Sequence, residues 1–279
     1  MRISVLLILL LLLTGCRQQV PSSFVTEVLN GYTPVKNQGK SQTCWAYAML
    51  AAIETEHIMR GDSVHLSPAY VEMRMTEDRR APKSKRGMGQ TLLNLIQRYG
   101  IVGYDAMKTV DTPAPRWVFL YGAQYTPVEF AHSVCAPDEY IALTTTAKYP
   151  YGKEVVLEVP DNWEHNRFLN IPADSLLAHT ARAVRQHHGV CWEGDISERG
   201  FSFEAGIADL SLINGRTTDD HCMSIVGIAH NPEGKRFFIL KNSWGTDNPY
   251  GGLMYMSFDY FKAKTIAVYL TKEAFLSSR

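Results

Sequence analysis

The sequence predicts an α+β protein in which helices occupy the first half of the chain and β-strands the second half. In the first half, apolar residues recur at spacings of three and four, as on one face of a helix. In the second half, short apolar runs alternate with Gly, Asn and Pro turns. The 279 residues, 46% of them hydrophobic, are enough for one large domain or two packed lobes. A cleft between two such lobes is the expected place for a functional site.

Start and stop signals bound the predicted helices. Ser67 followed by Pro68 provides an N-cap and a residue suited to the first helical position. Gly100 and Gly189 stand where two further apolar patterns end, as helix-terminating glycines do. The predicted helices are residues 44–60, a helix starting at Pro68, residues 89–100 and residues 173–189.

The predicted strands are rich in β-branched and aromatic residues, and most of them lie after residue 189. "HNPEGK" separates two of them and has the composition of a hairpin loop. The predicted strands are residues 139–146, 154–159, 190–196, 221–229, 236–242, 251–258 and 265–270.

The N-terminus has the features of an export signal. Arg2 precedes an apolar run at residues 3–13, which is shorter than the roughly 20 residues needed to cross a bilayer. "LTGC" then ends at Cys16 and resembles the lipobox of bacterial lipoproteins. This resemblance implies a lipoprotein signal peptide at residues 1–15 and lipid attachment at Cys16. We expect residues 16–31 to carry the lipid and form a short linker, and residues 32–279 to form the folded domain. The expected location is the bacterial cell envelope, with the protein held to a membrane, on its periplasmic or outer-surface face, by its lipid. A plain signal peptide or an uncleaved anchor is the alternative.

Composition and missing motifs exclude several classes of function. The net formal charge is zero and the one basic run is "KSKR" at residues 83–86, so we expect no nucleic-acid partner. No CxxC motif is present, and we expect no metal site and no cofactor. The absence of GxSxG, HExxH and GxGxxG motifs excludes the common serine hydrolase, zincin and dinucleotide-binding patterns.

Cys44 is the candidate nucleophile, because it opens the predicted helix 44–60. Unpaired N–H groups and the helix dipole stabilise a thiolate at that position. His221 begins one predicted strand and Asn242 follows the next, so a hairpin brings the two together. Asn242 then accepts a hydrogen bond from one ring nitrogen while the other faces Cys44, which is a generalised catalytic triad. The alternative is that Cys44 is a small buried residue that fills core space.

The segments "TPVKNQGKSQTCWAYA", "HCMSIVG" and "KNSWG" resemble the papain superfamily of cysteine peptidases. The resemblance implies a papain-like fold, in which a helical lobe and an antiparallel β-barrel-like lobe enclose the active-site cleft. It implies that Cys44 is the nucleophile, that His221 is its base and that Asn242 orients His221. It also implies that Gln38 donates a hydrogen bond to the oxyanion and that Trp244, in the substrate cleft, shields the Asn–His pair from water.

Further stretches, among them "GQTLLNLIQRYGIV" and "DEYIALTTTAKYPYGKEVVLEV", resemble the bleomycin hydrolase and aminopeptidase C branch of that superfamily. The segment 104–139 is too short for the branch's hexamer-forming insertion, and little sequence follows the last predicted strand. We therefore expect a monomer without strict restriction to peptide N-termini. The family's substrate-binding Gly-Gly pair corresponds to Met88–Gly89, which leaves Gly89 to bind the substrate backbone.

Together these features predict a membrane-tethered cysteine peptidase that acts on peptides or proteins through a thioester acyl-enzyme. An aminopeptidase is the first alternative. A cell-wall amidase or acyltransferase, and an inactive peptidase-like binding lipoprotein, are weaker ones.

Several other polar or reactive side chains are expected to lie outside the site. We expect His187 and His188 to be solvent-exposed, and His230 to lie at the far end of the strand that His221 begins. Cys222 is expected to face the core. Glu193 and Asp195 are expected at the surface, with the edge of the cleft as the alternative.

Overall fold

The computed structural model describes residues 24–120, 122–210, 218 and 221–277. The predicted signal peptide and the predicted lipid-attachment residue Cys16 lie outside these residues. In the part of the chain that is described, no helix is long and apolar enough to cross a membrane.

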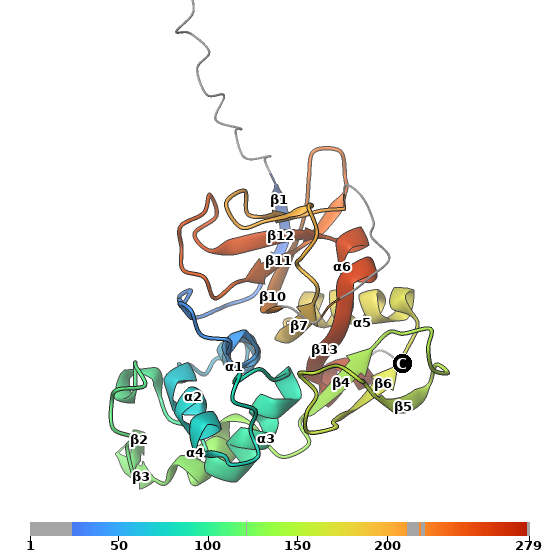
Figure 1. The fold of residues 1–279 in the computed structure, drawn as a ribbon. Helices are drawn as coiled ribbons and strands as arrows, with labels where there is room; N and C mark the ends of the chain where they lie inside the picture. The colour runs from blue at the N-terminus through green and yellow to red at the C-terminus, as the bar shows by residue number, and fades with distance from the viewer. Residues whose placement is uncertain (1–23, 121, 211–217, 219–220, 278–279) are drawn as a thin grey trace, which may run out of the picture.

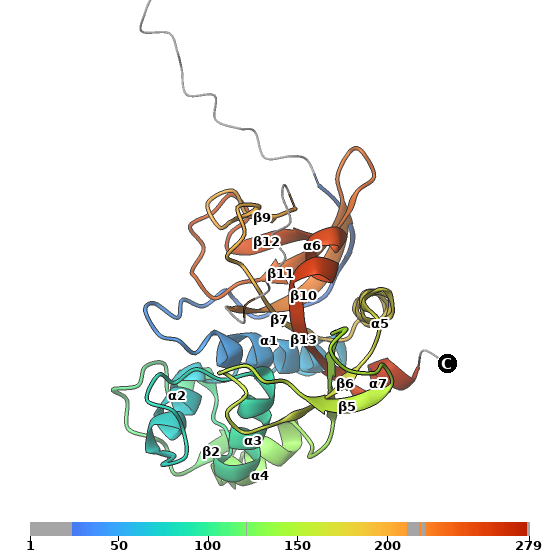
Figure 2. The same ribbon diagram turned by 45° about the vertical axis from the view of Figure 1, so that its right-hand side comes forward.

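Four helices and a small hairpin form one lobe, at the bottom of Figure 1. Helix α1 has apolar residues of its own on all its faces, and it is therefore buried over most of its length. Figure 2 shows that it lies between the other helices of this lobe and the large sheet. The elements of the lobe are α1 (Cys44–Met59), α2 (Pro68–Glu77), α3 (Gly89–Tyr99), the 3-10 turn η1 (Tyr104–Ala106), the strands β2 (Val118–Leu120) and β3 (Ala123–Tyr125), and α4 (Pro127–Val134).

The other lobe is built on an 11-stranded sheet with the order β5-β6-β4-β13-β7-β10-β11-β12-β9-β8, to which β1 adds beside β10. Neighbouring strands are antiparallel except for the pairs β12–β9 and β4–β6. The strands are β1 (Val25–Leu29), β4 (Tyr140–Thr144), β5 (Lys153–Val156), β6 (Arg167–Asn170), β7 (Val190–Gly194), β8 (Phe201–Ser202), β9 (Ile207–Ala208), β10 (His221–His230), β11 (Arg236–Lys241), β12 (Leu253–Ser257) and β13 (Thr265–Thr271). The predicted α+β class with two lobes is confirmed.

The centre of the sheet is buried on both faces, and two apolar cores result. One core lies between the sheet and α1–α4, and it includes Cys191 and Cys222. The other lies under α5 (Ala173–Arg185), α6 (Phe258–Lys264) and α7 (Lys272–Leu276), and it includes Trp192 and Met223. Because side chains alternate along a strand, β7 and β10 contribute to both cores.

One boundary predicted from the sequence is wrong. Residues 25–29 were assigned to the linker 16–31, but they form β1, which pairs antiparallel with β10. Phe24 stacks on Tyr255 with ring centroids 3.9 Å apart, and the backbone N–H of Asn30 donates to the carbonyl of Val226. The folded domain therefore begins before residue 32.

The turn between α5 and β7 fixes the position of α1. The backbone N–H of Gly189 donates to Glu56 Oε1 at 3.0 Å, and His188 Nδ1 lies 3.2 Å from the same oxygen. His188 is therefore partly buried, whereas His187 is exposed as predicted. A Cβ atom at Gly189 would lie 2.1 Å from the carbonyl oxygen of Ala52, so the turn packs directly on the helix backbone.

Replacing Gly189 by Ala is expected to lower the free energy of unfolding by about 1–3 kcal/mol, because α1 and β7 must move apart to admit the methyl group. Gly103→Ala is the matched control, since the nearest atom to its added Cβ is 3.8 Å away. Urea unfolding followed by tryptophan fluorescence measures both. Equal midpoints for the two variants would contradict the close packing of this turn.

Candidate active site

One cavity of about 240 Å³ brings together segments that are far apart in the sequence. It lies where α1 and β10 begin, between the two lobes. The predicted residues that line it are Gln38, Cys44, His221 and Trp244. Asn242 lies directly behind His221 and completes the predicted set.

Helix α1 places Cys44 at its first residue, where the backbone N–H groups have no partner within the helix. Thr43 occupies the N-cap position, but its side chain does not cap the helix. Its hydroxyl instead lies 2.6 Å from Ser41 Oγ. The helix N-terminus is thus left available to stabilise negative charge on the cysteine sulfur.

The Asn242 amide fixes the proton on His221. Asn242 Oδ1 accepts a hydrogen bond from the backbone N–H of Ser243 at 2.7 Å, which identifies this atom as the amide oxygen. His221 Nε2 lies 2.8 Å from the same oxygen, so Nε2 carries the proton and donates it. The other ring nitrogen, Nδ1, is left to interact with Cys44. The Trp244 ring covers this pair, with its centroid 4.6 Å from that of the imidazole.

The surroundings of Cys44 favour its thiolate form. Its pKa is lowered well below the ordinary value, first by a hydrogen bond with Cys222 and then by the hydrogen bond and charge of His221, which together outweigh burial. Burial raises the pKa of Cys135 to about 12 and raises that of Cys191. Among the four described cysteines, only Cys44 has the electrostatics of a nucleophile.

Gln38 is held against the turn that carries Asn242. Its backbone N–H donates to the carbonyl of Ser243 at 2.8 Å, and its Oε1 accepts from Ser243 Oγ at 2.6 Å. Nε2 donates one N–H to the carbonyl of Ser41 at 2.7 Å. An amide nitrogen has a second N–H, and this group together with the backbone N–H of Cys44 can form an oxyanion hole.

The cavity also contains charged residues that the sequence did not identify. Arg86, the last residue of the basic run "KSKR", donates hydrogen bonds to both carboxylate oxygens of Asp161, with the shortest at 2.7 Å. Glu193 also lines the cavity, is fully buried, and accepts a hydrogen bond from Tyr269 at 3.0 Å. The expected surface position of Glu193 and Asp195 is therefore wrong, since both are buried, and Glu193 takes the alternative position at the cleft.

The substrate-binding role predicted for Gly89 is not supported by its position. Gly87, not Gly89, lines the cavity. Gly89 is already the first residue of α3, and a Cβ there would lie 2.7 Å from the Tyr269 ring. The extended backbone that can pair with a peptide therefore ends at Met88, whose φ is −113°.

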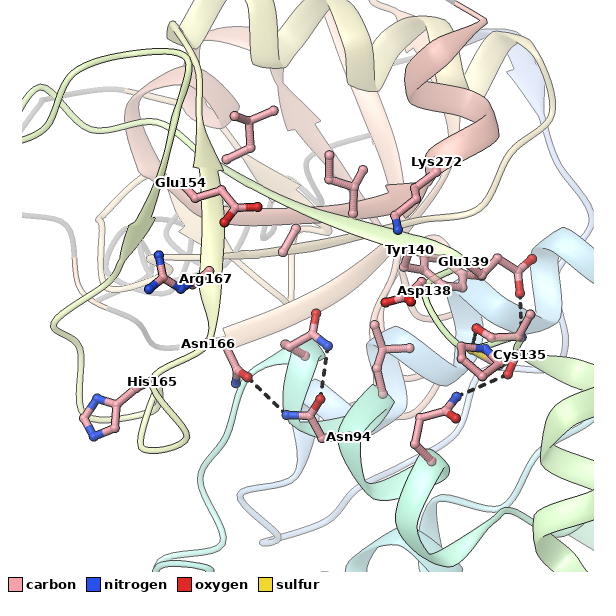
Figure 3. A pocket seen from close by; sticks show the side chains of 18 residues that line it. Asn94, Cys135, Asp138, Glu139, Tyr140, Glu154, His165, Asn166, Arg167 and Lys272 are labelled. Carbon is pink, nitrogen blue, oxygen red and sulfur yellow. Dashed lines mark hydrogen bonds between the residues drawn. The ribbon is translucent and has the colours of Figure 1, made fainter.

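A larger cavity, of about 640 Å³, is lined in part by α3 and is shown in Figure 3. It contains Cys135 and His165, but these two side chains stand at opposite ends of the view. Because burial raises the pKa of Cys135 and no histidine contacts it in Figure 3, this cavity lacks the chemistry found beside Cys44. The smaller cavity is the candidate active site.

Known proteins share this fold and parts of this sequence. Residues 136–271 match the model of the papain family cysteine proteases. Aminopeptidase G of Lactobacillus delbrueckii subsp. lactis is 28% identical over 53% of this chain and 40% of its own length. Ananain of Ananas comosus is 25% identical over 86% of this chain and 56% of its own length. The chain thus spans about half the length of the curated relatives it matches.

The structure of PepW from Lactobacillus rhamnosis superposes with a TM-score of 0.69 and 16% identity, over 90% of this chain and 82% of that one. The predicted papain-like fold is therefore confirmed. The family model and the named relatives support the expected enzyme class, a papain-family cysteine peptidase.

Alkylation of Cys44 by iodoacetamide is expected to stay fast below the ordinary cysteine pKa of about 8.5, because a lowered pKa keeps the thiolate populated at lower pH. His221→Ala removes one of the groups that lower the pKa of Cys44. The rate at which Cys44 is alkylated at pH 6 is therefore expected to be at least about tenfold lower in this variant than in the wild type. Mass spectrometry of the Cys44 peptide across pH 5–9 measures this. Cys135 is the internal control, and its peptide should stay unmodified in the folded protein. Identical profiles for wild type and His221→Ala would contradict the pairing.

Proposed function

We propose that this chain is an active papain-type cysteine peptidase that hydrolyses peptide bonds through a thioester acyl-enzyme. One observation carries the proposal. Cys44 and His221 line one cavity, and Asn242 holds the imidazole tautomer in which Nδ1 can take the cysteine proton. The names of the relatives, which include a cysteine protease and aminopeptidases, support the same reaction class.

The proposed reaction follows from the position of each group. His221 Nδ1 accepts the proton of Cys44, and the thiolate attacks the carbonyl carbon of the scissile peptide bond. The second N–H of Gln38 and the backbone N–H of Cys44 stabilise the oxyanion that forms. Protonated His221 then donates its proton to the leaving amine, and a water molecule activated by the same imidazole hydrolyses the thioester.

An aminopeptidase is the alternative within this class. Three of the relatives, from Lactobacillus species, are named aminopeptidases G, W and E. Among the described residues, none after Trp244 lines the cavity, so no C-terminal segment that the structure describes fills it. The Arg86–Asp161 ion pair also lines the cavity. A cavity that no described C-terminal segment fills favours a peptidase that also accepts internal peptide bonds.

An inactive binding lipoprotein is the alternative from another class. It would need neither a lowered pKa at Cys44 nor a histidine whose tautomer is fixed. The oriented Gln38 amide and the Asn242–His221 hydrogen bond would likewise serve no purpose in a protein that only binds peptides. The retention of all these features supports catalysis.

A library of peptides with free and N-acetylated termini is expected to be hydrolysed by the wild-type protein under reducing conditions at neutral pH. Cys44→Ala removes the nucleophile and should abolish hydrolysis, and Gln38→Ala is expected to lower kcat by about 10²–10³-fold. Cys135→Ala is the matched control and should retain activity, because Cys135 lies outside the cavity. Liquid chromatography with mass spectrometry identifies the products.

The products of the same experiment separate the alternatives. Equal cleavage of both kinds of peptide excludes a strict aminopeptidase, and cleavage of free N-termini alone establishes one. If the folded, reduced wild type cleaves nothing, the binding protein is the better description.

We also propose that Cys16 carries a lipid that tethers the protein to a membrane of the bacterial cell envelope. The apolar run at residues 3–13 and the "LTGC" that ends at Cys16 support this. Even fully extended, residues 17–23 span no more than about 25 Å. The lipid would therefore hold β1 and the sheet beside it close to the membrane surface.

When the full chain is produced in a bacterium, the wild type is expected to partition into the detergent phase of Triton X-114. Cys16→Ser, which cannot be acylated at this position, should lose most of the lipid-bearing species. Mass spectrometry of the mature N-terminal peptide checks the modification directly. An unmodified wild-type Cys16 in the membrane fraction would contradict lipid attachment and favour an uncleaved anchor.

A further inference from the structure

A second thiol faces the candidate nucleophile. Cys222 follows His221 on β10, and its side chain lines the same cavity as Cys44. Each of the two thiols also shifts the pKa of the other. Cys222 also belongs to the apolar core against which Cys44 packs, so the expectation that it faces the core is confirmed, whereas the expectation that it lies outside the site is wrong. That face is where α1 begins.

Cys222 is held firmly in this position. Its backbone pairs with Glu193 of β7, and its side chain also lines a crevice formed by Tyr47 and Ala48 one turn further along α1. Its exposed fraction is 2%, whereas Cys44 is partly exposed to the cavity. All four described cysteines, including these two, are free thiols.

The two thiols differ in reactivity. The pKa of Cys44 is lowered, chiefly by the hydrogen bond with Cys222, and that of Cys222 is raised well above the ordinary value by burial. Oxidants react with thiolates, and access decides which thiolate they reach. A small oxidant that enters the cavity therefore meets a reactive Cys44 first, with a protected thiol beside it.

We propose that Cys222 is a resolving cysteine, which converts an oxidised Cys44 into a reversible Cys44–Cys222 disulfide. In the first step, the Cys44 thiolate attacks hydrogen peroxide, the O–O bond breaks, and a sulfenic acid and hydroxide form. In the second step, the Cys222 sulfur attacks the sulfenic sulfur, an S–S bond forms, the S–O bond breaks, and the hydroxyl group leaves with the Cys222 proton as water. A dithiol such as dithiothreitol reduces the bond and becomes oxidised itself.

The disulfide has two consequences at this site. It removes the nucleophile, so a peptidase in this state is inactive until it is reduced. It also prevents Cys44 from advancing to sulfinic acid, which thiols do not reduce. The first consequence rests on the proposed peptidase function, whereas the formation of the bond itself does not.

Treatment of the reduced full chain with hydrogen peroxide, followed by non-reducing peptide mapping, tests the proposal. In the wild type we expect a linked pair of peptides that contain Cys44 and Cys222, and dithiothreitol should restore at least about 80% of iodoacetamide labelling at Cys44. In Cys222→Ala and Cys222→Ser we expect a gain of two oxygen atoms at Cys44 and little recovery of labelling. Because loss of Cys222 also changes the pKa of Cys44, the proteins are compared at equal extents of Cys44 oxidation.

Cys191→Ala is the matched control, because Cys191 is buried in the same core but does not line the cavity. It should form the Cys44–Cys222 bond as the wild type does. Absence of the linked peptides in the wild type, or equal recovery in Cys222→Ala, would overturn the proposal. Peptide mapping needs no activity, so a linked pair in a protein that cleaves no peptide would refute only the peptidase function. Cleavage without the linked pair would refute only the role of Cys222.

Discussion

The packing of α1 along β10 is the constraint on which the site depends. Cys44 is the first residue of the helix and His221 is the first residue of the strand, so the axial position of one element on the other sets the distance between sulfur and imidazole. A shift of α1 by one residue would move Cys44 by about 1.5 Å along the helix axis and rotate it by about 100°. The groups that fix the helix therefore also fix the chemistry.

Two buried carboxylates supply much of that fixation. Glu56 accepts the backbone N–H of Gly189 and so holds α1 to the turn that enters β7. Glu54 accepts hydrogen bonds from Lys36 Nζ at 2.9 Å and from the N–H of Leu66 at 2.7 Å, and from the hydroxyl of Thr33. The same two carboxylates thereby connect the helix to the segment before it and to the sheet.

The Glu54 network reaches three of the segments that carry the site. Lys241 Nζ lies 2.8 Å from Thr33 Oγ1 and 3.7 Å from Glu54 Oε2, and burial lowers its pKa to about 8. Lys36 precedes the Gln38 loop, Glu54 is in the helix of Cys44, and Lys241 precedes Asn242. Buried ion pairs are weak evidence for stability, and their best-attested role is to fix register. Here they link the three segments that carry Gln38, Cys44 and Asn242.

Local signals explain what could be predicted from the sequence. Ser67 caps α2 as expected, since its hydroxyl accepts the N–H of Tyr70, and the resemblance of the segment before Cys44 to the papain superfamily implied the oxyanion donor Gln38. The residues that were missed depend on contacts that no local pattern encodes. Strand β1 carries mostly exposed side chains and is defined by its pairing with β10, and Asp161 reaches the cavity from an irregular loop. For such residues, tertiary contacts override local propensity.

Cys222 shows where strand periodicity stops being informative. Alternation along β10 correctly placed its side chain on a buried face, but it could not show that the start of α1 lies on that face. At this position, the Cys44 sulfur is both the most nucleophilic of the described thiols and the one most exposed to oxidants. The interactions that favour the thiolate form of Cys44 also make it the described thiol that is most open to oxidation. A neighbouring thiol that helps to stabilise the thiolate is also the group placed to capture its oxidised form, so one contact serves both purposes.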